Sequence, residues 1–202
     1  NIPWALTPEQ KITVEDVKYI LSSYYQGTEY NPYGRGNSPK KGIYRSIGIN
    51  RTGCMAVLQI RNNVPDEIRG VEWICFGSNA FNTIVPMYVN VPKMPKYIQD
   101  VSLDISTDNL YWNSRLIGAL ADAHFGTAII FIERYQASVV TQGRAIMREY
   151  DAKMKETGNF ALSLEANEKI AAMTAKETMS VLKNVLYDAS CHMKNGYQRF
   201  DN

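Results

Sequence analysis

Three cysteines and two histidines are the side chains with the widest chemical range in this sequence. Cys54, Cys75 and Cys191 are widely spaced and odd in number, which argues against a disulfide framework. No Cys-x-x-Cys pair is present, so we expect no zinc site, no other metal and no cofactor. Cys191 and His192 are adjacent, and neighbours on a helix point in different directions, so they do not form a nucleophile–base pair. From residue chemistry alone, the chain offers no complete catalytic set.

A more specific group of candidates lies between residues 59 and 88. Small polar residues that follow a strand are typical of binding sites, and Asn79 and Asn82 follow such a segment. Asparagine amides can donate to an oxyanion, and Arg61 can hold a substrate carboxylate through paired hydrogen bonds. We therefore expect Asn79, Asn82 and Arg61 to bind substrate, with Trp73 in support. The alternative is that residues 78–79 form a plain turn and that Arg61 is a surface residue of a strand.

Tyrosines cluster around a long segment rich in Gly, Pro, Asn and Ser, residues 28–42, which we expect to be a loop. The cluster consists of Tyr24, Tyr25, Tyr30, Tyr33 and Tyr44. An apolar ring with a polar tip suits a substrate pocket, and it suits equally well a core sealed beneath the loop.

The elements that must position these residues begin with a helix over residues 13–26, capped by Thr13 with Asp16 three positions later. Alternating side chains then predict four strands, at residues 44–49, 55–61, 71–77 and 83–91. Pro86 lacks the amide donor, which predicts an edge or a bulge for the fourth strand. Short consecutive strands joined by turns indicate an antiparallel sheet over the region 44–91.

Helices follow the sheet, over the region 107–195. The first is expected to begin at a cap on Thr107 or Asp108 and to run to residue 123, with a break near Gly126. The second is expected over residues 127–155, with a stop at residues 157–159, and the third from a Ser163 cap to Gly196. A sheet followed by long helices gives an α+β class, in one unit over residues 1–202.

Composition excludes several functional classes. The net charge is +2 and no basic stripe is present, so we expect no nucleic-acid partner. The longest apolar run, residues 126–132, is far too short to cross a bilayer, so we expect no membrane segment. The first residue is Asn rather than Met, which leads us to expect a longer parent protein with its true start upstream.

An ordered series of motifs resembles the C69 family of dipeptidase A-like enzymes. The series covers roughly residues 13–125 and consists of Tyr24–Pro32, Gln59-Ile60-Arg61, Pro65, Val71-Glu72-Trp73, Phe76-Gly77-Ser78, Val85–Tyr88 and Tyr111–Arg115. Each motif is weak alone, and it is their ordered series along the chain that makes the resemblance strong.

The resemblance implies an αββα sandwich of the N-terminal-nucleophile kind. It also implies dipeptide hydrolysis by a cysteine that becomes the first residue after processing. The α-amino group of that cysteine serves as the base, because an α-amine titrates near neutrality. No cysteine of this chain matches the family's nucleophile motif, so we expect the nucleophile upstream and no catalytic residue here. The chain then corresponds to a C-terminal portion that is inactive alone.

The expected partners are a dipeptide substrate, the N-terminal portion of the same protein and a second copy in a homo-oligomer. The bacterial cytoplasm is the expected location. Two alternatives stay open: a related hydrolase of acyl amides, which needs an apolar slot, and a non-catalytic assembly module built on the long helices.

Overall fold

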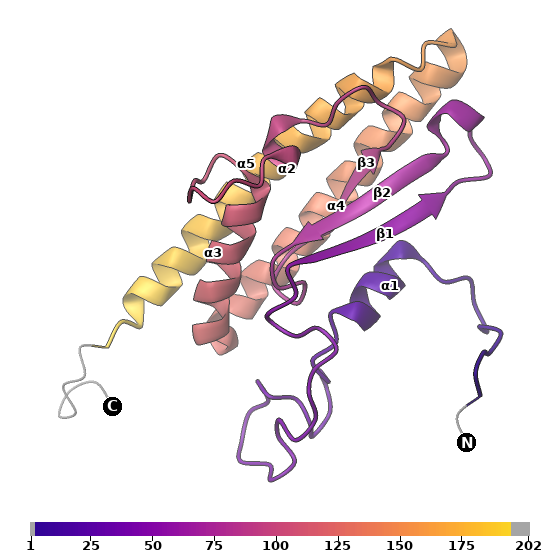
Figure 1. Cartoon of the computed structure of the whole chain (residues 1–202). Helices are drawn as coiled ribbons and strands as arrows, with labels where there is room; N and C mark the ends of the chain where they lie inside the picture. Colours follow the sequence, from indigo (N-terminus) through magenta and orange to yellow (C-terminus); the bar gives the residue numbers. More distant parts are fainter. Residues whose placement is uncertain (1–2, 195–202) are drawn as a thin grey trace.

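The computed structural model describes residues 3–194. It is an α+β fold with a three-stranded antiparallel sheet of order β1-β2-β3 (Figure 1). The strands are β1 (Cys54–Ile60), β2 (Gly70–Phe76) and β3 (Val85–Tyr88), with the short 3₁₀ helix η1 (Asp66–Ile68) between the first two. The helices are α1 (Val14–Leu21), α2 (Lys96–Gln99), α3 (Leu110–Ala123), α4 (Phe125–Thr157) and α5 (Leu162–Cys191).

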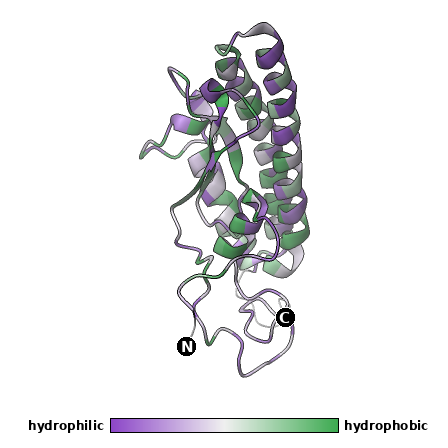
Figure 2. Ribbon diagram, turned by 90° about the vertical axis from the view of Figure 1, so that its right-hand side faces the viewer, coloured by the Kyte–Doolittle hydropathy of each residue, from purple (hydrophilic) through white to green (hydrophobic). Residues whose placement is uncertain are grey.

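Two long helices form the layer behind the sheet. Figure 2 shows α4 and α5 running side by side along one flank of the molecule, with the sheet as a second layer beside them. Gly143 of α4 lets the helix approach the ring of Pro86 in β3, because a Cβ there would lie 3.0 Å from Pro86 Cγ. The turn between the long helices contains Gly158, whose φ of 67° is left-handed and ends α4.

Pro86 lies in the edge strand β3, as its missing amide donor predicts. The free edge of β3 is covered by Asn167 of α5, which is fully buried. Asn167 accepts from the Tyr88 amide at 2.9 Å and donates to the Tyr88 carbonyl at 2.9 Å. The side-chain amide therefore takes the place that a further strand would occupy.

The sheet has one covered face and one that is partly open. The side chains of Val57 and Trp73 share the face toward α4, where Trp73 is buried. On the other face α3 covers the Phe76 end, where the ring of Tyr111 lies edge-on to Phe76 at 6.0 Å. Leu58 and Ile60 of β1 stay exposed on that face, at 77% and 67%. An apolar stripe on β1 is thus uncovered within this chain.

Several sequence-based predictions of the elements are wrong. Residues 44–49 form no strand, because they are not paired with another strand, and the sheet region begins at residue 54 rather than 44. The first helix is capped by Thr13 and Asp16 as expected, but it ends at Leu21 rather than at residue 26. The fourth predicted strand shortens to Val85–Tyr88.

The helical region also differs in its boundaries. Asn109, not Thr107 or Asp108, caps α3, since its side chain accepts from the Trp112 amide. The break between α3 and α4 falls at His124, two residues before Gly126. Ser163 lies inside the first turn of α5, whose N-cap Ala161 makes no side-chain cap. The predicted stop at Gly196 lies outside the described residues.

The long segment between α1 and β1 is anchored by two aromatic groups. Tyr24 and Tyr33 pack with Phe125, and the Tyr33 and Phe125 rings stack at 4.0 Å. Tyr30 and Tyr44 lie against each other nearer the surface. The first group seals the core beneath the segment, while Tyr24 also lines a cavity described below.

Candidate functional site

The connection between β2 and β3, residues 77–83, is the centre of the candidate site. Gly77 adopts a left-handed φ of 68° and turns the chain sharply at the end of β2. Three buried polar atoms in this connection have no hydrogen-bond partner: Ser78 Oγ, Asn79 Oδ1 and Asn82 Oδ1. Such atoms are uncommon in folded proteins, and three of them lie within the five residues 78–82.

The structure places Asn79 and Asn82 together in this connection, and both are buried. Asn79 Nδ2 donates to the Leu21 carbonyl at the end of α1 at 2.6 Å. Asn82 Nδ2 donates to the carbonyls of Ser78 and of Ser114 in α3, at 2.9 and 3.0 Å. Their donors are therefore engaged in holding the connection between α1 and α3 and are not directed at an oxyanion.

A cavity of about 580 Å³ lies on one side of the connection, between α1 and α4. Ala80 and Ile84 contribute apolar wall from the connection, and Ile129 and Val140 contribute it from α4. A cavity of this size with mostly apolar walls and a few charged groups is typical of small-molecule sites.

Lys18 of α1 contacts the connection directly. Its ammonium donates to Ser22 Oγ at 2.7 Å and to the carbonyl of Asn79. No carboxylate pairs with it among the described residues. Burial lowers the pKa of Lys18 below its ordinary value, since the charged form loses hydration there.

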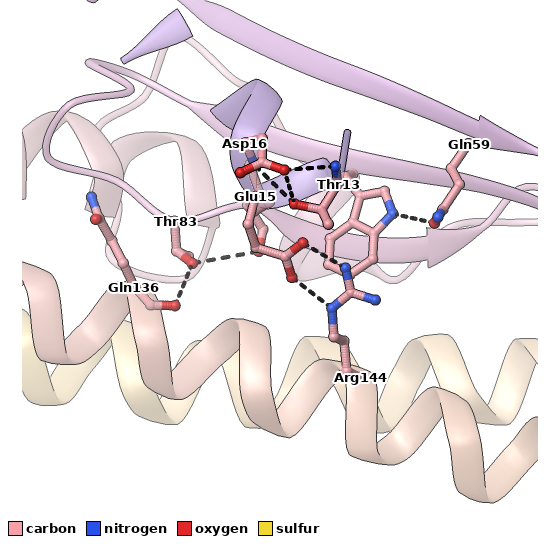
Figure 3. A network of polar contacts seen from close by, with 9 residues as sticks. Thr13, Glu15, Asp16, Gln59, Thr83, Gln136 and Arg144 are labelled. Carbon is pink, nitrogen blue, oxygen red and sulfur yellow. Dashed lines mark hydrogen bonds and ion pairs between the residues drawn. The ribbon is translucent and has the colours of Figure 1, made fainter. Parts of the chain in front are cut away.

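An ion pair between α1 and α4 forms part of the wall of the larger cavity. Arg144 donates to the two carboxylate oxygens of Glu15, at 2.6 and 2.7 Å (Figure 3). Burial raises the pKa of Glu15, but the hydrogen bonds from Arg144 outweigh it, so the pKa is lowered overall. The guanidinium also lies 4.7 Å from the ring centroid of Trp73. Trp73 donates to Gln59 at 2.9 Å, so its role here is to support Arg144 from within the core.

Arg61 lies at the opposite end of β2 from the connection, roughly 20 Å away along a seven-residue strand. It binds both oxygens of Asp151 in α4, at 2.6 and 3.1 Å, and donates to the Ile68 carbonyl at 2.6 Å. Tyr88 donates to the same carboxylate at 2.8 Å, and burial followed by the Asp151 contact raises the pKa of Tyr88. The structure therefore separates Arg61 from Asn79 and Asn82 and engages its guanidinium within the fold.

A second cavity, of about 290 Å³, lies on the other side of the connection, against α3. It is lined by Gly77, Ser78, Gly118 and Asp122 and by two arginines, Arg51 and Arg115. Neither arginine makes an ion pair or a side-chain hydrogen bond with any residue from 3 to 194.

The three cysteines lie in different environments, with Cys54 and Cys191 exposed and Cys75 buried. Cys75 is fully buried, and burial raises its pKa to about 12, although nearby Lys18 acts in the opposite direction. Burial also raises the pKa of Cys54. His192 Nδ1 lies 2.8 Å from the Asp188 carbonyl, on its own helix, so that nitrogen is engaged away from a thiol. Among these residues no group of His, Cys, Asp and Glu is assembled for a metal ion.

Comparison with known proteins gives the family. Residues 1–138 match the model of peptidase family C69, which is more than half of the chain. A "Probable dipeptidase A" of Streptococcus pyogenes serotype M18 (strain MGAS8232) is 41% identical over 201 residues, 99% of this chain and 42% of that protein. A "Probable dipeptidase B" of Lactococcus lactis subsp. lactis (strain IL1403) is 35% identical over 203 residues, 100% of this chain and 42% of its own length.

A third relative, a "Dipeptidase" of Bifidobacterium longum (strain NCC 2705), is 34% identical over 243 residues, 100% of this chain and 46% of that protein. The chain belongs to peptidase family C69, which confirms the resemblance found in its motifs. It spans less than half the length of these relatives. No helix within residues 3–194 combines the length and apolar character that a membrane span requires.

Sequence reasoning missed the residues that line the cavities. Lys18 appears in the sequence as an ordinary helix residue, Arg51 carries no local signal, and Arg115 enters only as the last residue of the Tyr111–Arg115 motif. Ser78 appears in the sequence as part of a possible turn and of the Phe76-Gly77-Ser78 motif, and neither pattern predicts that it lines a cavity. Only the packing of α1, α3 and α4 around residues 77–83 brings these groups together.

Proposed function

We propose that the protein to which this chain belongs hydrolyses dipeptides, and that this chain forms part of the wall that holds the substrate. The observation that carries the proposal is family membership along the chain, with relatives named as dipeptidases. Two cavities flanking one polar connection provide room for the two residues of a dipeptide.

The nucleophile, on this proposal, lies outside this sequence. A thiol acts as its thiolate, and a buried thiol with a pKa of about 12 is almost wholly protonated at neutral pH. An exposed cysteine whose pKa is raised, such as Cys54, is likewise a poor nucleophile. A cysteine at the start of the mature protein, with its own α-amine as base, needs no histidine from this chain.

The uncovered stripe on β1 supports a larger assembly. Exposed Leu58 and Ile60 lie on the sheet face opposite α4, where a second sheet would complete an αββα sandwich. We propose that the remaining part of the protein covers this face. A second copy of the chain is the competing occupant, and the mass of the purified full-length protein in solution distinguishes the two.

The test compares the full-length protein with this 202-residue chain on a panel of dipeptides, with released amino acids as the readout. We expect turnover by the full-length protein and none by the chain alone. Turnover by the chain alone would contradict an external nucleophile. Failure of the full-length protein on every dipeptide would contradict the proposed activity.

The apolar walls of the larger cavity favour a second candidate, a hydrolase of acyl amides. Such a substrate places an uncharged acyl chain where a dipeptide carries an ammonium group. The same assay with N-acyl amino acids separates the two, because a dipeptidase should prefer a free amino terminus.

A further inference from the structure

The smaller cavity is lined by polar residues whose hydrogen-bonding groups are not all paired with one another. Ser78 is only 6% exposed and is among the residues that line this cavity, and its buried hydroxyl oxygen has no hydrogen-bond partner among the described residues. A buried hydroxyl without a hydrogen-bond partner is unfavourable, because it has lost its contacts with water and gained none in the protein. A ligand that accepts from this hydroxyl would remove that cost.

The position of Ser78 is set by its neighbours and is not accidental. Its carbonyl accepts from the Phe81 amide at 3.1 Å and from Asn82 Nδ2 at 2.9 Å. Gly118 of α3 faces the serine, and a Cβ there would lie 3.6 Å from Ser78 Cβ. The absence of a side chain at Gly118 leaves the space beside Ser78 open.

The charges around the cavity select a ligand of one negative charge. Arg51 and Arg115 contribute two positive charges, and neither is paired with a described carboxylate. Asp122 contributes one negative charge and already accepts from the Tyr33 hydroxyl. The sum is one positive charge in excess, which a single carboxylate would balance.

We propose that this cavity binds the terminal carboxylate of the dipeptide, with Arg51 and Arg115 as its cationic partners and the Ser78 hydroxyl as a neutral donor. The proposal rests on the proposed function, because it assumes a dipeptide as substrate. Planar guanidinium groups match the two oxygens of a carboxylate, and such charge-assisted pairs are among the stronger hydrogen bonds. Ser78 is a binding group here and not a nucleophile, since no base contacts its hydroxyl.

The experiment uses the full-length protein and two probes, L-alanyl-L-alanine and its C-terminal amide, which lacks the carboxylate charge. We expect wild type to prefer the free acid, and Arg115→Gln to raise KM for the acid about tenfold or more while the amide is unaffected. Arg51→Gln should act in the same direction. Ser78→Ala should raise KM for the acid several-fold without lowering the melting temperature, since the hydroxyl is unpaired within the chain.

Arg134→Gln is the matched control, because Arg134 is an exposed arginine of α4 that lines neither cavity. It should leave the preference for the free acid unchanged. If Arg115→Gln also leaves that preference unchanged, or weakens both probes equally, the carboxylate site is refuted and the dipeptidase activity stands.

A binding measurement separates failure of the site from failure of the function. If neither probe is hydrolysed, calorimetric titration of the same proteins with both probes decides the matter. Tighter binding of the acid that Arg115→Gln abolishes supports the site without the activity. Equal binding of acid and amide refutes the site.

Discussion

Replacing Asp151 with Asn should destabilise the protein strongly, because it leaves Arg61 charged and unpaired in a poorly hydrated position. The two side chains are only 13% and 15% exposed and are joined by two hydrogen bonds. Removing one partner of a buried pair typically costs 3–5 kcal/mol. The partial exposure of this pair places the expected loss near the lower end, at about 3 kcal/mol.

Other contacts at this position should change little. Asparagine is nearly isosteric with aspartate, and Tyr88 keeps an acceptor in the Met147 carbonyl at 3.2 Å. The lost charge pairing should therefore account for most of the effect. In urea, 3 kcal/mol corresponds to a fall of the unfolding midpoint by about 1 M, if the slope is about 3 kcal/mol per M.

The assay is urea unfolding followed by far-ultraviolet circular dichroism for wild type, Asp151→Asn and the double variant Arg61→Met with Asp151→Leu. The double variant removes both charges, so its stability should return close to that of wild type. A change below about 0.5 kcal/mol in Asp151→Asn would refute the reasoning. Such a small change would also mean that Arg61 does not depend on Asp151 and is free to bind substrate.

Three further predictions concern packing, backbone conformation and pH. Asn167→Leu should lower the free energy of unfolding by about 2–4 kcal/mol in the same urea assay. The substitution leaves the Tyr88 amide and carbonyl, at the buried edge of β3, without hydrogen-bond partners. Gly158→Ala should cost about 1 kcal/mol for its left-handed φ alone, whereas Gly77→Ala should cost more, since its Cβ would also crowd atoms at 3.3 Å. Equal losses would contradict that crowding.

The pH prediction uses the lowered pKa of Glu15. A carboxylate with a lowered pKa adds stability above its unfolded pKa, and that stability is lost as pH falls through the folded pKa. The partly exposed pair with Arg144 should contribute no more than about 1 kcal/mol. The difference in stability between wild type and Glu15→Gln should therefore be present at pH 7 and shrink below the ordinary glutamate range.

The sequence predicts a strand correctly where side chains alternate in hydrophobicity and a neighbouring strand is also available for pairing. Residues 55–61 and 71–77 alternate in hydrophobicity and become β1 and β2, each within one residue of the expected bounds. Residues 44–49 have a similar local pattern but pair with no strand, and strand formation depends on a partner that local pattern cannot supply. Helix ends fail for a related reason, since several neighbouring polar residues compete for one cap.

The candidate site is predicted less completely than the fold. The sequence alone predicts that Asn79 and Asn82 lie close together, because residues 79–82 belong to one short connection. Arg61 and Trp73 were grouped with them by chemistry, and the strand carries them away from the connection. Arg51 and Arg115 are 64 positions apart in the numbering and meet only through tertiary packing. Whether the four predicted residues bind substrate stays a prediction.

The unpaired amide oxygens of Asn79 and Asn82 result from the way in which both side chains hold the connection in place. An asparagine amide has both donor and acceptor capacity, and here Asn79 donates to the end of α1 and Asn82 donates to the Ser114 carbonyl within α3. Reversing either amide would place its oxygen against a carbonyl oxygen, so the unpaired acceptors are a consequence of this anchoring. The anchoring in turn fixes Ser78, which is the one residue of these three that is among those lining a cavity. Loss of either amide should therefore weaken substrate binding through displacement of Ser78, in addition to any direct contact that the two buried side chains make with substrate.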